Sequence, residues 1–218
     1  MESLKTLILN RFKLFLVLTA SMALSLVLLM VRMKLNQSFY LLFLVWNLFL
    51  ALIPFLITLW LRSSKNLNWL SLIPAFVIWM LFLPNAPYIV TDLLHLRNAE
   101  IHLMWLDVLV ITSFAFNGLA LFYISVSDMN TILKCFLRPK SLNLLMFTIF
   151  GATAFGIYLG RFLRYNSWEI VNNPFSILKN CTHLIFKPNV EAWIFTLTFG
   201  AFLWVSYQLL NVFGSKYD

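Results

Sequence analysis

The chain has 218 residues, of which 61% are hydrophobic and only 11% are charged, and its formal net charge at pH 7 is +8. An average domain has roughly a quarter of its residues charged, and a soluble fold of this length cannot bury so many apolar side chains, so lipid must cover them. The lysines and arginines stand singly or in small groups between apolar runs, which does not indicate nucleic-acid binding. We therefore expect an integral membrane protein whose basic residues contact lipid headgroups.

Six apolar stretches are candidates for transmembrane helices, since a span needs about 20 mainly apolar residues. They cover residues 14–31, 39–61, 67–83, 103–125, 142–163 and 192–213. The first follows Lys5, Arg11 and Lys13 as in a secretory signal, but its apolar run of about 18 residues exceeds a signal's hydrophobic region, which favours an uncleaved helix. The predicted fold class is all-α: a polytopic membrane bundle of about six helices, forming a single domain over 1–218.

The third predicted span is short because it meets two prolines, Pro84 and Pro87. Proline lacks an amide donor and disfavours a helical conformation in the residue before it. The apolar segment that follows is too short to cross a bilayer, so we predict a short interfacial or re-entrant helix over 85–97. A second non-spanning segment, an outer loop over 164–191, precedes the last predicted span.

The distribution of lysine and arginine predicts the orientation, because cytoplasmic loops carry an excess of both. With the N-terminus inside, the cytoplasmic side holds Lys5, Arg11, Lys13, Arg62, Lys65, Lys134, Arg138, Lys140 and Lys216. The outer side then holds Arg32, Lys34, Arg97, Arg161, Arg164, Lys179 and Lys187. This small excess predicts that both termini are cytoplasmic. All the histidines and most of the acids fall on the outer side, where we expect any site.

Asp92 and His95 lie three positions apart in the predicted helix over 85–97 and share one of its faces. A carboxylate so placed can orient an imidazole and favour its charged form, as in acid/base chemistry and around metals. The amide of Asn85, held between two prolines, is a candidate cap for the same helix. The alternative is a capped helix with interfacial polar residues and no chemistry.

Asp107 is the acid that is hardest to explain as a surface group. If the fourth span begins near residue 101, six residues at a rise of about 1.5 Å place it about 9 Å into the membrane. A carboxylate at that depth is costly unless it is paired, protonated or next to a wet cavity. A structural ion pair and a functional role both stay open, and Asp107 joins Asp92 and His95 as a candidate catalytic residue.

A second polar group begins at the end of the fifth span. Arg161 and Arg164 are three positions apart on one helix face, and the planar guanidinium fork suits a carboxylate or a phosphate. Together with Asn166, Glu169 and Asn85 they are candidate substrate- or anion-binding residues. The alternative is that the arginines extend to the lipid headgroups.

A ridge of small residues, Ala152, Gly156 and Gly160, recurs at every fourth position of the fifth span. Small residues at this spacing let helix backbones approach closely in lipid. The ridge therefore predicts helix packing, and it is also a candidate contact for a protein partner.

Other catalytic and metal-binding patterns are absent from the sequence. It holds no Walker loop, GxSxG, HExxH or EF-hand loop. Its two cysteines, Cys135 and Cys181, have no zinc-type spacing and are predicted on opposite sides of the membrane. We expect no metal site and no cofactor.

Three stretches carry a family resemblance. They are LPNAPYIVTDL at residues 83–93, WLD at 105–107 and GRFLRYNSW at 160–168. Together they resemble an uncharacterised bacterial integral-membrane family, domain of unknown function 1361, and the resemblance covers residues 40–212. It implies a multi-span fold in a bacterial plasma membrane and no particular activity.

Three functions fit these features. The first is a membrane enzyme or binding site for a lipid-linked or anionic substrate, in which arginines hold the anion and Asp92, His95 or Asp107 transfers protons. The second is a non-catalytic accessory or assembly subunit whose polar cluster is a brace or a docking site. The third is a small-solute transporter, which is disfavoured because the sequence predicts no titratable group near mid-membrane and shows no inverted repeat.

Overall fold

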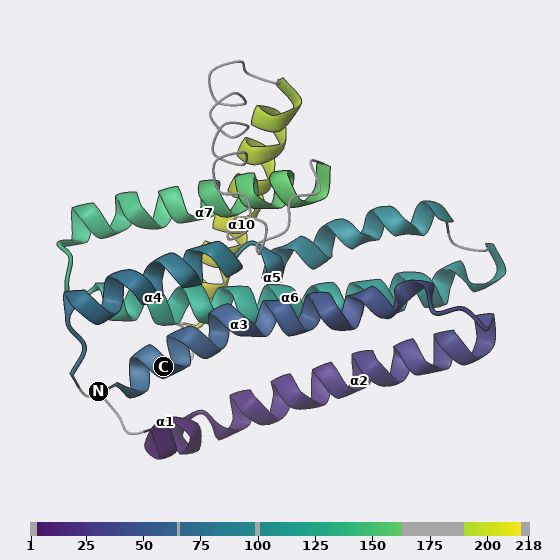
Figure 1. Ribbon diagram of the computed structural model, residues 1–218, viewed down its shortest axis with the longest axis horizontal. Coiled ribbons are helices and arrows are strands. Elements are labelled where there is room, and N and C mark those ends of the chain that lie inside the picture. The colour runs from purple at the N-terminus through teal and green to yellow at the C-terminus, as the bar shows by residue number, and fades with distance from the viewer. Residues whose placement is uncertain (1–3, 65, 99–100, 163–189, 215–218) are drawn as a thin grey trace. The chain divides into compact units, whose positions relative to one another are not determined.

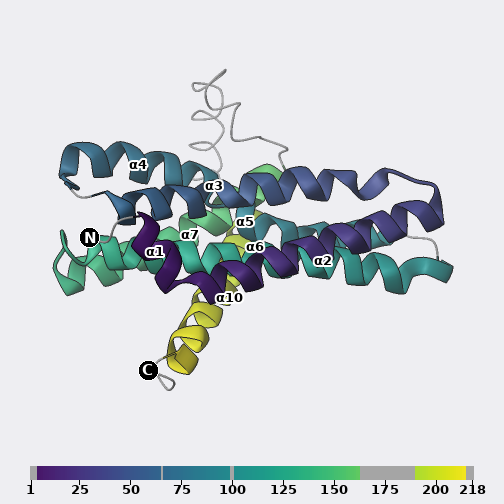
Figure 2. The same ribbon diagram turned by 90° about the horizontal axis from the view of Figure 1, so that it is seen from below.

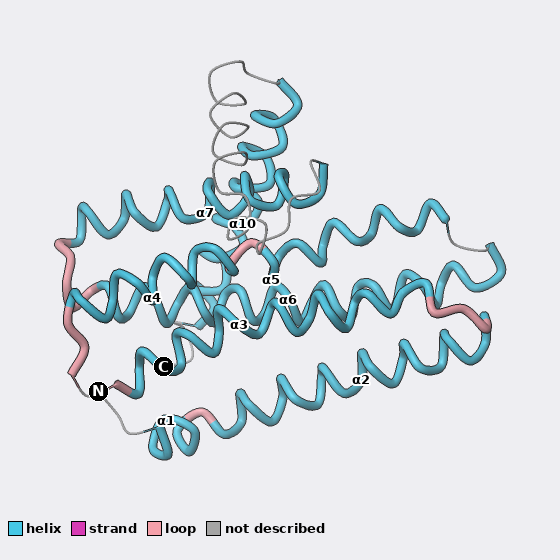
Figure 3. Tube along the Cα trace, viewed as in Figure 1, coloured by secondary structure: helices cyan, strands magenta, loops and turns pink. Residues whose placement is uncertain are grey.

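The computed structural model describes residues 4–64, 66–98, 101–162 and 190–214. Every regular element in these ranges is helical, as Figure 3 shows by colour, so the predicted all-α class is confirmed. The chain divides into two compact units, Met1–Ile132 and Leu133–Asp218. The expectation of a single domain over 1–218 stays a prediction.

The first unit contains four helical segments long enough to span a membrane, joined by shorter helices (Figure 1). Its elements are α1 (Leu4–Asn10), α2 (Phe12–Asn36), η1 (Tyr40–Leu42), α3 (Phe43–Ser63), α4 (Trp69–Phe82), α5 (Asn85–Tyr88), η2 (Ile89–Asn98), η3 (Ile101–Leu103) and α6 (Met104–Leu133), the η elements being 3₁₀ helices. Figure 2 shows α1 turned away from the direction of α2. The bend lies at Arg11, whose φ of −110° and ψ of 20° interrupt the helix.

Six helical segments of the described chain are long and apolar enough to cross a membrane. They are Phe12–Asn36, Tyr40–Ser63, Trp69–Arg97, Met104–Leu133, Pro139–Phe162 and Val190–Val212. Each overlaps one predicted span, and together they show a multi-pass membrane protein. The boundaries differ most for the third segment, which was expected to end at residue 83, and for the fourth, which was expected to end at residue 125.

α4 ends at Phe82, one residue before the predicted end of the third span, and the helical path then continues through both prolines to Arg97. Leu83 keeps helical angles (φ −55°, ψ −41°), as does Pro84 (φ −60°, ψ −25°). Both prolines lie at the start of α5, where the first residues of a helix have no backbone carbonyl to bond, so the missing N–H of proline costs little. The amide of Ala86 bonds to the Leu83 carbonyl at 3.2 Å. After α4 the chain therefore stays helical through α5 and the 3₁₀ helix η2, and the segment extends to Arg97. A short helix does follow α4, but its place in the membrane interface stays a prediction.

α6 and α5 approach each other at Gly118. A Cβ atom added there would collide with the carbonyl oxygen of Ala86 and lie 3.1 Å from the side chain of Ile89. Ala86 and Ile89 are both fully buried. The absence of a side chain at position 118 therefore lets these two backbones meet, as small residues do between membrane helices.

A buried polar link joins α3, α4 and α6 in the core of the first unit. The indole nitrogen of Trp79 donates to the hydroxyl of Ser125 at 2.8 Å, and that hydroxyl lies 3.5 Å from the hydroxyl of Thr58. Thr58 in turn donates to the carbonyl of Phe55 at 2.9 Å. All of these polar groups are therefore satisfied without water, as a hydrocarbon environment requires.

The second unit consists of α7 (Pro139–Phe162) and α10 (Val190–Gly214), which pack against each other. Ring contacts pair Phe150 with Tyr207 and Tyr158 with Phe195, so the two helices run antiparallel. The described close approach is at Gly200, where an added Cβ would lie 3.7 Å from the Cα of Gly151.

Gly151 does not belong to the predicted ridge. Ala152 is exposed, and Gly156 and Gly160 are half-buried. The contact of this ridge with a protein partner stays a prediction.

Candidate functional site

Asp92 and His95 form the first polar contact of interest. They lie in η2, whose three residues per turn place side chains at positions i and i+3 directly above each other. Oδ1 of Asp92 and Nε2 of His95 are 3.8 Å apart, an ion-pair distance that is too long for a hydrogen bond. Asp92 is 1% exposed and the His95 side chain is 30% exposed. The pair therefore connects a buried carboxylate to an accessible imidazole.

Two further residues complete this group, which we call the Asp92 cluster: Tyr40, Asn47, Asp92 and His95. The hydroxyl of Tyr40 lies 2.8 Å from Nδ1 of His95. Nδ2 of Asn47 donates to Oδ2 of Asp92 at 2.8 Å. The ring of Phe43 lies 4.9 Å from the imidazole, centroid to centroid, and helps to hold its plane. Residues from η1, α3 and η2 thus position one histidine.

The Asp92 cluster places one imidazole between a hydroxyl and a carboxylate. A neutral imidazole has one donor and one acceptor nitrogen, and the hydroxyl of Tyr40 donates naturally to Nδ1. This assignment places the proton of Nε2 on the side of Asp92, whose charge stabilises the imidazole when it takes up a second proton.

Asp107 lies in a different environment, where it pairs with Arg32, a residue that the sequence indicates only as a topology signal. Nε of Arg32 donates to Oδ1 of Asp107 at 2.7 Å, and Nη2 lies 3.3 Å from Oδ2. A third bond, from Nη1 to the carbonyl of Ser38, is 3.1 Å long. Both charged side chains are 5% exposed. This neutral, buried and well-bonded pair ties α2 to α6.

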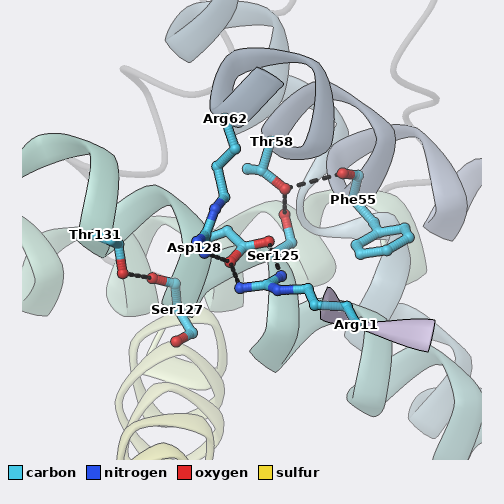
Figure 4. Close-up of polar contacts among 8 residues, drawn as sticks. All are labelled: Arg11, Phe55, Thr58, Arg62, Ser125, Ser127, Asp128 and Thr131. Atoms are coloured by element: carbon cyan, nitrogen blue, oxygen red, sulfur yellow. Dashed lines mark hydrogen bonds and ion pairs between the residues drawn. The ribbon is translucent and has the colours of Figure 1, made fainter. Parts of the chain in front are cut away.

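Asp128 has two arginine partners at the opposite end of α6, as Figure 4 shows. Nη1 and Nη2 of Arg11 donate to its two oxygens at 2.8 and 2.7 Å. Nη1 of Arg62 donates to Oδ1 at 2.6 Å. Asp128 is 1% exposed, whereas each arginine side chain is 25% exposed. We call these three residues the Asp128 cluster.

The pairs of Asp107 and Asp128 mark the two ends of the first unit. Asp107 and Asp128 are 21 positions apart in one helix, which at a rise of about 1.5 Å per residue is about 31 Å. Their partners on the other side, Arg32 and Arg11, are also 21 positions apart, so α2 and α6 run antiparallel in a constant register. The separation matches the hydrocarbon core of a bilayer, about 30 Å. A bilayer of that thickness would place one pair at each boundary of its hydrocarbon core.

The polar contact between these ends is uncharged. Nδ2 of Asn117 donates to the hydroxyl of Ser25 at 2.9 Å and to the carbonyl of Ser113 at 3.0 Å. Asn117 is 1% exposed and links α6 to α2 about halfway between the two carboxylates. Neutral polar groups at this depth serve helix association well.

The remaining candidate site residues are placed only in part. Asn85 is the first residue of α5, after Pro84 at the N-cap, and its Nδ2 donates back to the carbonyl of Phe82 at 2.9 Å; its role as a helix cap stays a prediction. This bond covers a carbonyl whose helical donor, the amide of Ala86, bonds to the carbonyl of Leu83. Arg161 is half-buried in the last turn of α7, in the second unit. The other three, Arg164, Asn166 and Glu169, lie outside the described residues.

The sequence indicates the acidic residues of these clusters, but it does not indicate the residues that bond to them. The sequence does not single out Tyr40 or Asn47, and it indicates Arg32 only as part of the charge count that predicts the orientation. One signal was available: the equal spacing of 21 positions in the Arg11 and Arg32 pair and in the Asp107 and Asp128 pair, which indicates two antiparallel helices joined at both ends. No group of three potential metal-binding side chains occurs within the described residues.

These observations define the class of the molecule: a multi-pass α-helical membrane protein with polar clusters at the ends of its spans. The chain belongs to the family described as protein of unknown function (DUF1361), which matches residues 46–206, more than half of its length. The matched range includes Asp92, His95 and Asp107, whereas Arg32 and Tyr40 precede it. No curated protein and no solved structure matches the chain.

Proposed function

We propose that the protein is a membrane enzyme in which His95 transfers a proton to or from a lipid-linked or other anionic substrate. The observation that carries the proposal is the position of the imidazole between the hydroxyl of Tyr40 and the buried carboxylate of Asp92, with 30% of its side chain exposed. Asp92 stabilises the charged imidazole, and Tyr40 delivers or receives the proton at Nδ1. Asp107, neutralised by Arg32, acts as a brace.

Two exposed cations support an anionic substrate. Arg97 is exposed in η2, two residues after His95, and Lys34 is exposed at the end of α2. An anion bound beside the imidazole would be attracted by these exposed positive charges, and repulsion by Asp92 would be weaker because that carboxylate is buried. Arg161, Arg164, Asn166, Glu169 and Asn85 stay candidate anion-binding residues in this proposal.

We further propose that the chain resides in the plasma membrane of a bacterium with both termini in the cytoplasm. Six spans return the chain to its starting side, and the lysine and arginine excess favours that side as cytoplasmic. The Asp92 cluster then faces the outer surface. Tagging each terminus and testing its accessibility to an impermeant reagent in intact cells checks the orientation.

The catalytic proposal is tested by complementation. Cells lacking the gene are supplied with the wild-type chain, with His95→Gln, or with His102→Gln, the same substitution at an exposed histidine of η3 at the same end. Extracted lipids and lipid-linked intermediates are compared by mass spectrometry, and membrane immunoblots confirm equal protein levels. We expect wild type and His102→Gln to remove the species that accumulates in the deletion strain, and His95→Gln to leave it.

A second candidate function, a non-catalytic accessory subunit, is supported by the fully bonded Arg32–Asp107 pair. It makes the opposite prediction in the same experiment. A subunit that works by its shape needs the Arg32–Asp107 brace and not the imidazole, so His95→Gln would restore the wild-type lipid profile. That result, at a normal protein level, would falsify the catalytic role of His95.

A further inference from the structure

The Asp128 cluster carries a net positive charge, unlike a simple pair of one arginine and one aspartate. Arg11 and Arg62 together carry two positive charges, and Asp128 carries one negative charge. Among the described acids of the first unit, Asp92 and Asp107 lie at the other end of the helices. One positive charge is therefore left over in the described part of this cluster.

Unused hydrogen-bond donors accompany the extra charge. A guanidinium has five N–H donors. In the described structure Arg11 uses two of its nitrogens and Arg62 uses one, all toward Asp128. Asp128 is almost fully buried, but the two arginine side chains reach the surface. The free donors thus belong to the accessible part of the cluster.

The bonding to Asp128 also holds the two guanidinium groups close together. Nη2 of Arg11 and Nη1 of Arg62 both bond to Oδ1 of Asp128, at 2.7 and 2.6 Å. Two like charges at such short range repel each other, and a single carboxylate offsets only part of that repulsion. A second anion beside the arginines would complete the neutralisation.

The cluster lies at the depth of lipid headgroups. Arg62 is in the last turn of α3, and Arg11 is at the bend between α1 and α2. Trp60 and Trp69, at the neighbouring ends of α3 and α4, are 55% and 48% exposed, which is typical of the aromatic belt at a membrane interface. In the predicted orientation this end is cytoplasmic, where anionic lipids are plentiful.

We propose that Arg11 and Arg62 bind the phosphate of an anionic lipid headgroup, and that Asp128 is a positioning residue that aligns both guanidinium forks. Arginine recognises phosphate through paired N–H bonds of fixed geometry. The site is separate from the Asp92 cluster, because it lies at the other end of α6. It does not depend on the proposed enzymatic function.

The full-length protein, purified in detergent, tests the proposal by native mass spectrometry. It is titrated with phosphatidylglycerol, with phosphatidylcholine and with inorganic phosphate. Arg62→Gln removes one guanidinium while Arg11 keeps Asp128 paired. Lys13→Gln is the matched control, because Lys13 is an exposed cation close to the same end of α2.

We expect wild type to bind phosphatidylglycerol roughly tenfold more tightly than phosphatidylcholine, Arg62→Gln to lose roughly that tenfold preference, and Lys13→Gln to lose less than about twofold. Equal binding of both lipids, or equal losses in the two variants, would show that surface charge alone attracts the lipid and would overturn the proposal. Displacement of phosphatidylglycerol by equimolar inorganic phosphate would overturn its assignment to a lipid.

Thermal unfolding of each variant shows whether it is folded. If Arg62→Gln unfolds, Arg62→Lys provides the test, because it keeps the charge on Asp128 and lacks the planar fork. We expect Arg62→Lys to bind phosphatidylglycerol several-fold more weakly than wild type does. Wild-type affinity in this folded variant would contradict recognition by the guanidinium fork.

Discussion

The two carboxylates of α6 have different surroundings, although both are buried and both bond to arginine. Asp107 has one arginine, and the pair is neutral and almost fully enclosed. Asp128 has two, and the cluster keeps a positive charge and partly exposed guanidinium groups. With one arginine, Asp107 forms a neutral pair that braces two helices. With two arginines, Asp128 is part of a positively charged surface that can bind an anion.

The largest effect is expected from breaking the Arg32–Asp107 brace. Arg32→Met leaves the carboxylate of Asp107 buried without its partner, which costs about 3–5 kcal/mol in the free energy of unfolding. Unfolding of the purified protein by increasing SDS in mixed micelles measures this loss. The double variant Arg32→Met/Asp107→Leu replaces both charges by apolar groups and should recover most of the stability. A double variant as unstable as the single one would contradict the brace.

A smaller loss is expected where α6 meets α5. Gly118→Ala places a methyl group against the carbonyl of Ala86 and should lower the free energy of unfolding by about 1–3 kcal/mol, through overpacking. Gly151→Ala is the matched control, since an added Cβ there meets no atom within 4 Å. The same SDS titration compares the two. Equal stabilities would show that the approach at Gly118 is not tight.

The contrast between the two carboxylates predicts an unequal response to the same substitution. Asp128→Asn should cost about 1–2 kcal/mol, because the partly exposed Arg11 and Arg62 can turn toward water. Asp107→Asn should cost more, because Arg32 is enclosed. Equal losses in the two variants would remove the distinction between brace and anion site.

The smallest change in stability is expected at the Asp92 cluster. Tyr40→Phe removes one hydrogen bond of a side chain that is 42% exposed, so the free energy of unfolding should fall by no more than about 1 kcal/mol. If Tyr40 exchanges the proton with His95, the activity measured by complementation should nevertheless drop roughly 100-fold. A variant with wild-type activity would exclude this role for the phenol.

The helices were predictable from sequence because the cost of exposing a backbone to lipid makes each long apolar run helical. The proline pair was harder to interpret. Pro84 and Pro87 usually end a helix, and here their place at the start of α5 and the tight packing at Gly118 keep the chain helical. That outcome depends on a neighbouring helix, which local sequence rules do not include.

The acidic residues of the candidate site were predictable from the sequence, but the residues that pair with them were not. The depth of Asp107 in an apolar run showed that it needed compensation, but no local pattern identified the group that compensates its charge. The structure supplies Arg32, which is 75 positions away. Such pairing depends on which helices are neighbours. Asp92 and His95 were recognisable because their spacing is local, whereas Tyr40 comes from another helix.

The antiparallel register of α2 and α6 has a consequence for the choice of membrane. Arg11 and Arg32 are each tied to an aspartate of α6, so the distance between the two charged layers, about 31 Å, cannot adjust by sliding one helix along the other. In a much thinner bilayer the bundle must tilt to keep both layers at the interfaces, and in a thicker one the lipid must compress around it. The same contacts that stabilise the protein therefore make it sensitive to hydrophobic mismatch.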